Sequence, residues 1–261
     1  MSICSNSITI ADVMRDMVAG DVFSLGCDSC GIISQADRGA VPVSALAALN
    51  QRKKIKQKAR GTVLFHQGDG VSSLYRLLSG VVLLSQVDRS GVSVISHMVC
   101  PGQTLGFRAF IDGGLHGVSA VCATQAVLCC IPSDVVSQAF LSIPPLERVF
   151  ARHVAAELSA TEDAVMALSS RSVHDRMVLV LARLYRQFGS GQENGAARLV
   201  LPLLRSDIAA LAGAARETFS RSMHALESEG LVVLDGDEAV FPDMARFRRA
   251  AQLIQPGVWA D

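Results

Sequence analysis

The chain has 261 residues, of which 50% are hydrophobic and 5% aromatic, and its formal net charge is zero. This composition excludes a disordered chain, and the length allows one large or two modest domains, each with its own core. Because basic and acidic residues balance, charge alone neither indicates nor excludes a nucleic-acid partner.

The chain shows neither a targeting signal nor a membrane span. Residues 1–20 lack the basic start and compact apolar block of a secretory signal. The longest charge-free stretch, residues 113–133, is broken by glycines, His116 and Pro132. We therefore expect a cytoplasmic protein without a membrane partner, whose seven cysteines stay largely reduced. An odd number of cysteines there favours free thiols or metal and cluster ligands over disulfides.

Residues 1–44 have no sustained hydrophobic period, and we expect a loop-rich region. The candidate ligands in this region are Cys4 and the pair Cys27 and Cys30. The C-x-x-C spacing of the pair lets both sulfurs face one metal centre. A short helix is predicted over 43–49. The basic run at 51–60 is interpreted as a solvated strand edge rather than a nucleic-acid patch, since a strand follows directly and edge lysines block unwanted pairing.

Short apolar runs separated by turn residues fill the chain up to residue 142, a pattern typical of an antiparallel barrel or roll. The expected strands are 62–65, 73–80, 81–87, 92–99, 104–107, 120–123 and 126–132. Cys100, Cys122 and Cys130 lie in these runs and are interpreted as core residues. Alternation along the last strand places Cys129 and Cys130 on opposite faces.

The pattern becomes helical after Pro144 and Pro145. Apolar residues recur every three or four positions from Leu146 to Leu168, which predicts one long helix over 143–170. A single apolar stripe of that length favours packing on a second copy of the helix, the alternative being packing on the chain's own roll. Residues 169–172 are expected to form a hinge, followed by a helix over 173–188 and a flexible, glycine-rich loop over 189–197.

Residues 204–241 predict a helix-turn-helix followed by a hairpin. Ser206 is expected to cap a first helix, and Gly213 permits the sharp turn before a second helix at about 216–229. Ala215 stands at the second N-cap, where it forgoes a capping bond. Gly230 is placed to end the second helix. Two short apolar strands around the Asp235-Gly236 dipeptide complete a winged DNA-binding domain.

The second helix has two chemically different faces. Phe219, Met223 and Leu226 form a buried stripe at helical spacing. The opposite face carries Arg216, Glu217, Ser220, Arg221 and His224. Arginine offers a two-donor fork to guanine and glutamate accepts from cytosine N4, so this face suits the edges of base pairs. We therefore predict that it binds double-stranded DNA.

The fold class expected is α+β: an antiparallel β-roll, a long dimerisation helix and a C-terminal winged helix-turn-helix. The predicted boundaries are 1–44 for the loop region, 45–142 for the roll, 143–170 for the dimerisation helix, 171–246 for the winged domain and 247–261 for a C-terminal tail. This order resembles the CRP/FNR superfamily of bacterial transcription regulators, whose roll is of the cyclic-nucleotide-binding jelly-roll type. Residues 61–82, 101–107, 129–132 and 205–232 carry the resemblance.

The resemblance implies a homodimer that binds a palindromic promoter site, contacts RNA polymerase and has no enzymatic activity. It also implies that Glu217, Ser220 and Arg221 read a TTGAT-like half-site. Arg216 is the residue that cyclic-AMP-type readers carry beside the glutamate, so half-site preference stays open. The loop Asp88–Gly91 is a candidate polymerase contact by the same resemblance.

The family's cyclic-nucleotide members carry a glutamate after a roll glycine and an Arg-Ser pair about ten residues later. In this chain Phe107 follows Gly106, and Val118-Ser119 stands where the Arg-Ser pair would be. A cyclic phosphate is an anion and needs a cation in its pocket. We therefore expect no cyclic nucleotide as cofactor.

The chain is more similar to the fumarate and nitrate reduction (FNR) branch, which senses oxygen with a [4Fe–4S] cluster held by four thiolates. The resemblance assigns iron ligation to Cys27, Cys30 and Cys129. The third N-terminal cysteine is absent, and Asp37 falls about where it would stand. Asp37 or Cys4 is then the fourth ligand. In this interpretation loss of the cluster in oxygen weakens dimerisation and promoter binding.

Other signals remain open: a thiol, zinc, haem with a ligand such as His66, His97 or His116, or no cofactor at all. A thiol redox enzyme built on Cys27 and Cys30 is a weaker alternative. Such motifs usually start a helix after a strand in a βαβ unit, and neither flank has that pattern.

Overall fold

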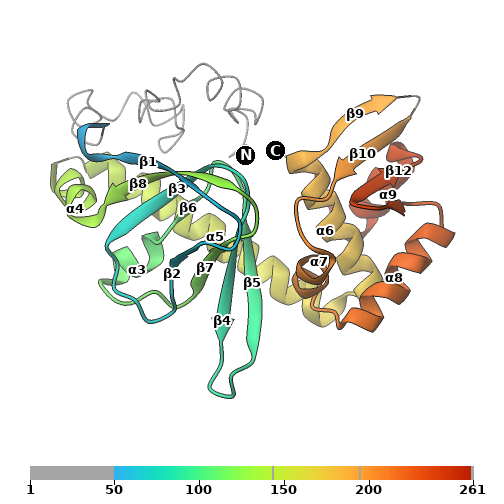
Figure 1. Ribbon diagram of the computed structural model, residues 1–261, viewed down its shortest axis with the longest axis horizontal. Coiled ribbons are helices and arrows are strands. Elements are labelled where there is room, and N and C mark those ends of the chain that lie inside the picture. Colours follow the sequence, from blue (N-terminus) through green and yellow to red (C-terminus); the bar gives the residue numbers. More distant parts are fainter. Residues whose placement is uncertain (1–49, 143, 194, 260–261) are drawn as a thin grey trace. The chain divides into compact units, whose positions relative to one another are not determined.

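The computed structural model describes residues 50–142, 144–193 and 195–259, in two compact units that divide at Ser159/Ala160 (Figure 1). The loop region predicted over 1–44 and the short helix predicted over 43–49 lie outside the described residues. In the part of the chain that is described, no helix is long and apolar enough to cross a membrane.

The first unit is built on a β-roll of two four-stranded antiparallel sheets. One sheet has the order β1-β8-β3-β6 and the other β2-β7-β4-β5. The strands are β1 (Lys54–Lys58), β2 (Val63–Phe65), β3 (Ser73–Ser79), β4 (Val82–Val87), β5 (Ser93–Val99), β6 (Thr104–Leu105), β7 (Ser119–Cys122) and β8 (Ala126–Pro132). The predicted antiparallel roll is therefore confirmed.

Three helices join the roll: α3 (Phe107–Asp112), α4 (Ser133–Ser142) and the first part of α5 (Pro144–Ser170). Helix α3 corrects one prediction, because residues 104–107 were expected to be a strand. The strand ends at Leu105, since Gly106 has a φ of 87° and its carbonyl accepts the Phe110 N–H at 3.1 Å, which opens a helix. Glycine adopts this positive φ at little cost.

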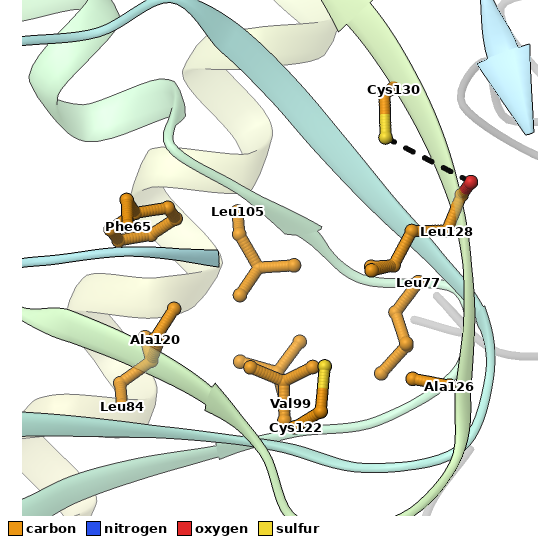
Figure 2. Close-up of a cluster of buried hydrophobic side chains, with 11 residues drawn as sticks. Phe65, Leu77, Leu84, Val99, Leu105, Ala120, Cys122, Ala126, Leu128 and Cys130 are labelled. Carbon is orange, nitrogen blue, oxygen red and sulfur yellow. Dashed lines mark hydrogen bonds between the residues drawn. The ribbon is translucent and has the colours of Figure 1, made fainter. Parts of the chain in front are cut away.

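Strand β8 separates two apolar cores. Between the sheets lie fully buried side chains that include Leu77, Cys122 and Leu128 (Figure 2). The other face of β8 packs with helices, where Ile131 belongs to a cluster with Phe107 of α3 and residues of α4 and α5. Successive residues of a strand point to opposite faces, so β8 serves both cores.

The basic run at 51–60 contains the edge strand β1, which pairs only with β8 among the described strands. Lys54 and Lys56 are exposed, and Arg52 lies 3.3 Å from Asp134 at the start of α4. The interpretation as a solvated strand edge is confirmed.

The second unit begins at Ala160, within α5, and contains a winged helix-turn-helix. Its elements are α6 (Val173–Phe188), β9 (Ser190–Glu193), β10 (Ala196–Val200), α7 (Arg205–Leu211), α8 (Arg216–Ser228), β11 (Val233–Asp235), β12 (Glu238–Phe241) and α9 (Met244–Ile254). One antiparallel sheet has the order β11-β12-β10-β9. Helix α6 has the predicted bounds, with Ser172 as its N-cap.

Two segments of this unit differ from the expected loop and tail. The loop expected at 189–197 forms β9, which pairs with β10 although its own sequence has no apolar alternation. Backbone hydrogen bonds to the partly buried β10 therefore hold β9 in place, although its side chains give it no apolar face to pack. The tail expected from residue 247 includes most of α9, where Phe247 is fully buried and its ring centre lies 4.5 Å from that of Phe241.

The turn between β3 and β4 has no room for a side chain. Gly80 has a φ of 91°, and a Cβ there would overlap the Gln125 carbonyl oxygen and come within 2.9 Å of the Ala126 Cα. We expect Gly80→Ala to lower the free energy of unfolding by more than about 1 kcal/mol, measured by urea denaturation. Gly68→Ala is the control, because Gly68 has the same φ of 91° and open space around it. Equal losses in the two variants would contradict the steric argument.

Glu157 of α5 carries a half-buried carboxyl, with 24% of its side chain exposed. Burial raises its pKa, and Arg108, whose Nη1 lies 4.0 Å from Oε1, opposes that shift. A raised pKa means that the native state holds the proton more tightly than the unfolded chain does, so this contribution to stability is lost as pH rises. We expect Glu157→Gln to be more stable than the wild type at pH 7 and the difference to shrink towards pH 4. Glu162→Gln, on an exposed position of the same helix, is the matched control. A Glu157→Gln protein that unfolds more easily at pH 7 would contradict this account.

Candidate functional site

The turn between α7 and α8 is fixed by Gly213. Its φ is 59°, and the N–H groups of Gly213 and Ala214 donate to the carbonyls of Ala210 and Ala209, each at 2.9 Å. A Cβ at Gly213 would lie 2.6 Å from the Cδ2 atom of Leu168 at the end of α5. The positive φ therefore favours glycine at this position, and the end of the Leu168 side chain lies close to its Cα.

The helix starts follow the sequence expectation only in part. Ser206 was predicted to cap α7, and this is wrong, because the N-cap is Leu204 and no side chain caps the helix. The helix begins two residues earlier, with the Leu204 carbonyl accepting from the Ile208 N–H at 3.0 Å. Ala215 is the N-cap of α8 and, as expected, makes no side-chain capping bond. Gly230, with a φ of 66°, follows the C-cap of α8.

Helix α8 buries one face and exposes the other. Phe219, Met223 and Leu226 are buried. All five predicted base-reading side chains are exposed on the remaining surface: Arg216, Glu217, Ser220, Arg221 and His224. The structure therefore brings these residues together on one helix, although their role in DNA binding stays a prediction.

The exposed face carries a pair of opposite charges one turn apart. Arg221 Nη2 lies 3.8 Å from Glu217 Oε2, and the two side chains are 77% and 90% exposed. Ion pairs this exposed contribute little to the stability of the fold. Stability therefore does not explain why Arg221 and Glu217 stand on this face of α8. Both groups are therefore accessible to a ligand.

The wing is tied to both helices of the pair. Strands β11 and β12 pair through Asp235 and Glu238, so the two-residue loop is Gly236-Asp237, one position later than the predicted dipeptide. Arg205 of α7 donates through Nη2 to the Gly236 carbonyl at 2.8 Å, and Glu227 of α8 accepts the Leu234 N–H at 3.2 Å. These bonds fix the wing beside the exposed face of α8.

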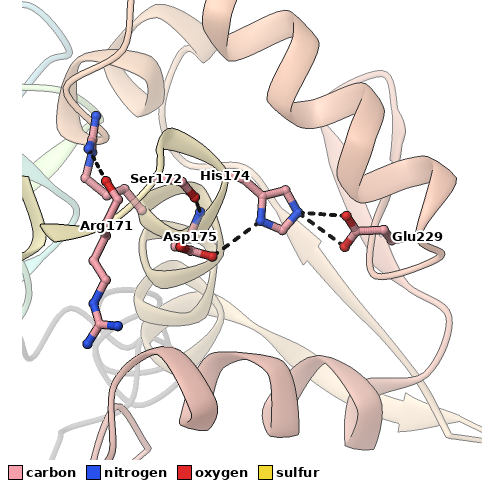
Figure 3. Close-up of polar contacts among 6 residues, drawn as sticks. Arg171, Ser172, His174, Asp175 and Glu229 are labelled. Carbon is pink, nitrogen blue, oxygen red and sulfur yellow. Dashed lines mark hydrogen bonds and ion pairs between the residues drawn. The ribbon is translucent and has the colours of Figure 1, made fainter.

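The first turn of α6 meets the far end of α8. His174 Nε2 lies 3.2 Å from the carboxylate of Glu229, and its Nδ1 lies 3.5 Å from Asp175 (Figure 3). Ser172 Oγ accepts the Asp175 N–H at 3.1 Å, which caps α6 beside this cluster (Figure 3). The predicted hinge at 169–172 is thus hydrogen-bonded to its neighbours.

The roll positions that differ from those of cyclic-nucleotide binders have packing roles. Phe107 is 6% exposed and belongs to the core beneath α4 and α5. Val118 packs on the core between the sheets, and Ser119 Oγ accepts the Gln67 N–H at 2.9 Å. Nearby, His116 stacks on Phe65 with ring centres 3.7 Å apart, and burial lowers the pKa of His116. Expected absence of a cyclic nucleotide remains a prediction.

Cys129 is the one predicted cluster ligand within the described residues. It is 1% exposed and lies in the cluster with Phe107 and Phe150, whereas Cys130 lies in the core between the sheets. The prediction that these two side chains face opposite ways is confirmed. Cys4, Cys27, Cys30 and Asp37 lie outside the described residues.

The remaining cysteines and histidines form no metal site within the described ranges, where no three His, Cys, Asp or Glu side chains gather as ligands. Cys100, Cys122 and Cys130 are buried, as expected for core residues. Burial raises the pKa of Cys122 and of Cys130, which favours their neutral thiols. His66, His97 and His116 are not brought together with other ligands.

An apolar groove lies among the helices of the first unit. It has a volume of about 910 Å³ and is lined by α3, α4 and α5. Leu141 and Leu158 on its walls are 89% and 58% exposed. Sequence periodicity pointed to α5 as apolar, but the contribution of α3 and α4 depends on the tertiary fold.

Comparisons with known proteins agree with this architecture. Residues 55–142 match the cyclic nucleotide-binding domain family, and residues 175–250 match the Crp-like helix-turn-helix domain. Among solved structures, FixK2 from Bradyrhizobium japonicum has a TM-score of 0.66 at 19% identity, with coverage of 76% of this chain and 96% of that one. The c-di-GMP responsive regulator CLP of Xanthomonas campestris has a TM-score of 0.65 at 20% identity, covering 77% and 99%.

Curated relatives are transcription regulators. The fumarate and nitrate reduction regulatory protein of Salmonella typhi is 28% identical over 187 residues, covering 71% of this chain and 73% of that protein. The anaerobic regulatory protein of Haemophilus influenzae is 27% identical over 194 residues, covering 74% of each. The CRP-like cAMP-activated global transcriptional regulator of Mycobacterium tuberculosis is 27% identical over 212 residues, covering 81% and 94%.

The roll, the long helix and the winged domain are those of DNA-binding regulators and not of an enzyme. The chain belongs to the CRP/FNR family of transcription regulators.

Proposed function

We propose that this regulator reads a two-fold promoter site through α8 of each protomer and responds to oxygen or redox state as FNR does. The observation that carries the DNA-reading part is the exposed face of α8, which gathers two arginines, a carboxylate and a hydroxyl above a buried apolar stripe. The assignment of the signal rests on Cys129 and on the N-terminal C-x-x-C pair.

Base recognition follows from the chemistry of three side chains. Arg221 presents a fork of donors to guanine O6 and N7, Glu217 accepts from cytosine N4, and Ser220 adds a hydroxyl between them. Arg221 and Glu217 each exchange the charge of the other, 3.8 Å away, for a base edge. Arg216 and His224, at the two ends of the exposed face, extend the contacts to phosphates or flanking bases.

A homodimer is supported by the surface of α5. Ala151, Leu158 and Val165 are exposed and stand seven residues apart, so they lie on one side of the helix. Exposed apolar residues at this spacing are typical of a helix that packs on its own copy. Two copies of α8 then face the two halves of a palindromic site.

Three residues support an iron–sulfur signal in place of a cyclic nucleotide: Cys27, Cys30 and Cys129. Relatives named anaerobic regulatory protein and fumarate and nitrate reduction regulatory protein agree with it. One relative of similar identity is named cAMP-activated, but Phe107 and Val118 supply no cation to a cyclic phosphate. Asp37, a harder ligand than a thiolate, or Cys4 would be the fourth ligand.

The burial of Cys129 suits a ligand that must be shielded, and its surroundings offer a route to the dimer helix. A [4Fe–4S] cluster, when bound, supplies an oxidant-sensitive link between the ligand residues. Cys129 packs in the same apolar cluster as Phe150 and Val154 of α5. A change in how Cys129 is held therefore alters the packing of α5 and, through it, the equilibrium between dimer and monomer.

RNA polymerase is a second proposed partner, contacted through the tip of the β4–β5 hairpin. The Ser90 hydroxyl donates to Asp88 at 2.6 Å, and the N–H groups of Val92 and Ser90 donate at 2.9 and 2.8 Å; these bonds, that of the hydroxyl foremost, lower the pKa of Asp88. The tip thus presents a fixed, ionised carboxylate beside exposed Arg89.

We expect Arg221→Ala to abolish specific binding through loss of a bidentate guanine contact worth about 1–3 kcal/mol. The measurement is a gel shift with a duplex that the wild-type protein has selected from random DNA, against an unselected duplex. Arg249→Ala, an exposed arginine on α9, is the control and is expected to keep the preference. Unchanged site preference in Arg221→Ala would refute the assignment.

We expect protein purified without oxygen to be brown, to contain iron and sulfide, and to bleach in air. Sedimentation before and after exposure to air measures the accompanying loss of dimer. Cys129→Ser should lose the colour, whereas Cys122→Ser, a buried thiol of the inner core, should keep it. Colourless anaerobic protein without iron would refute the cluster and leave DNA binding by the same fold with another signal.

A further inference from the structure

Arg176, in the first turn of α6, joins three separate segments of the second unit. Its Nε donates to the Ala212 carbonyl at 2.7 Å and its Nη2 to the Gly213 carbonyl at 3.3 Å. Its Nη1 donates to the Arg171 carbonyl at 2.7 Å and reaches that of Leu168 at 3.5 Å. One guanidinium thus binds both the turn of the helix-turn-helix and the end of α5.

The acceptors are groups that a helix end leaves without partners. The last carbonyls of α5 and α7 have no N–H of their own helix to bind, and they carry the negative end of the helix dipole. A planar guanidinium offers five donors in fixed directions and keeps its charge, which suits acceptors on two sides. Lysine has one compact ammonium group and cannot span the same carbonyls.

A second contact joins the same two segments independently of Arg176. The Leu168 side chain lies over the Cα of Gly213, where a Cβ would be 2.6 Å from Cδ2. At the end of α5 the Ser169 and Ser170 hydroxyls donate to carbonyls of the preceding turn of the same helix, and Ser172 caps α6. The stretch 169–172, predicted to be a hinge, is therefore hydrogen-bonded to both α5 and α6.

We propose that Arg176, together with Leu168, is a positioning residue for DNA recognition that locks the turn before α8 to the end of the dimer helix. The last turns of α5 and the reading helix then move as one body, and a displacement of α5 is transmitted to the orientation of α8. The proposal rests on DNA binding by α8 and is independent of the nature of the signal.

The test uses the full-length protein and a duplex that the wild type has selected from random DNA. We expect Arg176→Gln to lower affinity for this duplex at least about tenfold, the scale of losing bonds to a charged donor. The oligomeric state and affinity for unselected DNA should stay as in the wild type. Arg176→Lys should restore little of the loss, because it keeps the charge and loses the fork.

Hydrogen exchange distinguishes positioning from a general loss of structure. In Arg176→Gln the Gly213 and Ala214 amides should exchange faster, while amides in the middle of α8 keep the wild-type rate. Arg183→Gln, an exposed arginine on the same helix, is the matched control and should change neither rate nor affinity.

Leu168→Ala tests the joint from the α5 side and leaves every bond of Arg176 in place. We expect it to weaken selective binding several-fold with the winged domain still folded, so the proposal can be tested even if Arg176→Gln unfolds. Folded Arg176→Gln or Leu168→Ala protein with wild-type affinity for the selected duplex would overturn the proposal. A wild type that selects no duplex would instead refute DNA reading by α8, which separates the two failures.

Discussion

Burial of β8 on both faces is the constraint on which the first unit depends. Its even-numbered side chains Leu128 and Cys130 fill the core between the sheets, and its odd-numbered ones, Cys129 and Ile131, pack with the helices. Because protein interiors are close-packed, a shift in the packing on one face of β8 also shifts the packing on its other face. It therefore connects any event at Cys129 with both the roll and Phe150 on α5.

In the second unit, one face of α8 stays exposed while the rest of the helix is held in a fixed position. The buried stripe of α8 fixes the helix on its own domain, and bonds from Arg205, Glu227 and His174 fix the wing and the helix ends. The proposed reading side chains remain in solvent, so the entropy cost of ordering them would arise only when DNA is bound. The two units have separate cores, and α5 runs from one unit into the other.

Periodicity along the sequence predicted most of this fold, since the strands of the roll, α5, α6 and α8 all carry their own apolar pattern. It did not predict α3, because a single left-handed glycine, Gly106, turns a strand-like run into a helix. Nor did it predict β9, which is ordered by the backbone of β10. Helical spacing predicted that the five candidate reading residues are exposed on one helix. The contacts of Arg176 were not predictable, because its carbonyl partners lie up to 37 residues away in sequence.

The carboxylate of Glu217 has a consequence for selectivity. It is 90% exposed on the face that would meet a polyanion, in a chain with no net positive charge to compensate. A negative group there penalises every duplex that offers no donor at the matching base, by repulsion and by desolvation. Discrimination by this regulator would then come as much from rejecting wrong sequences as from attraction to the right one.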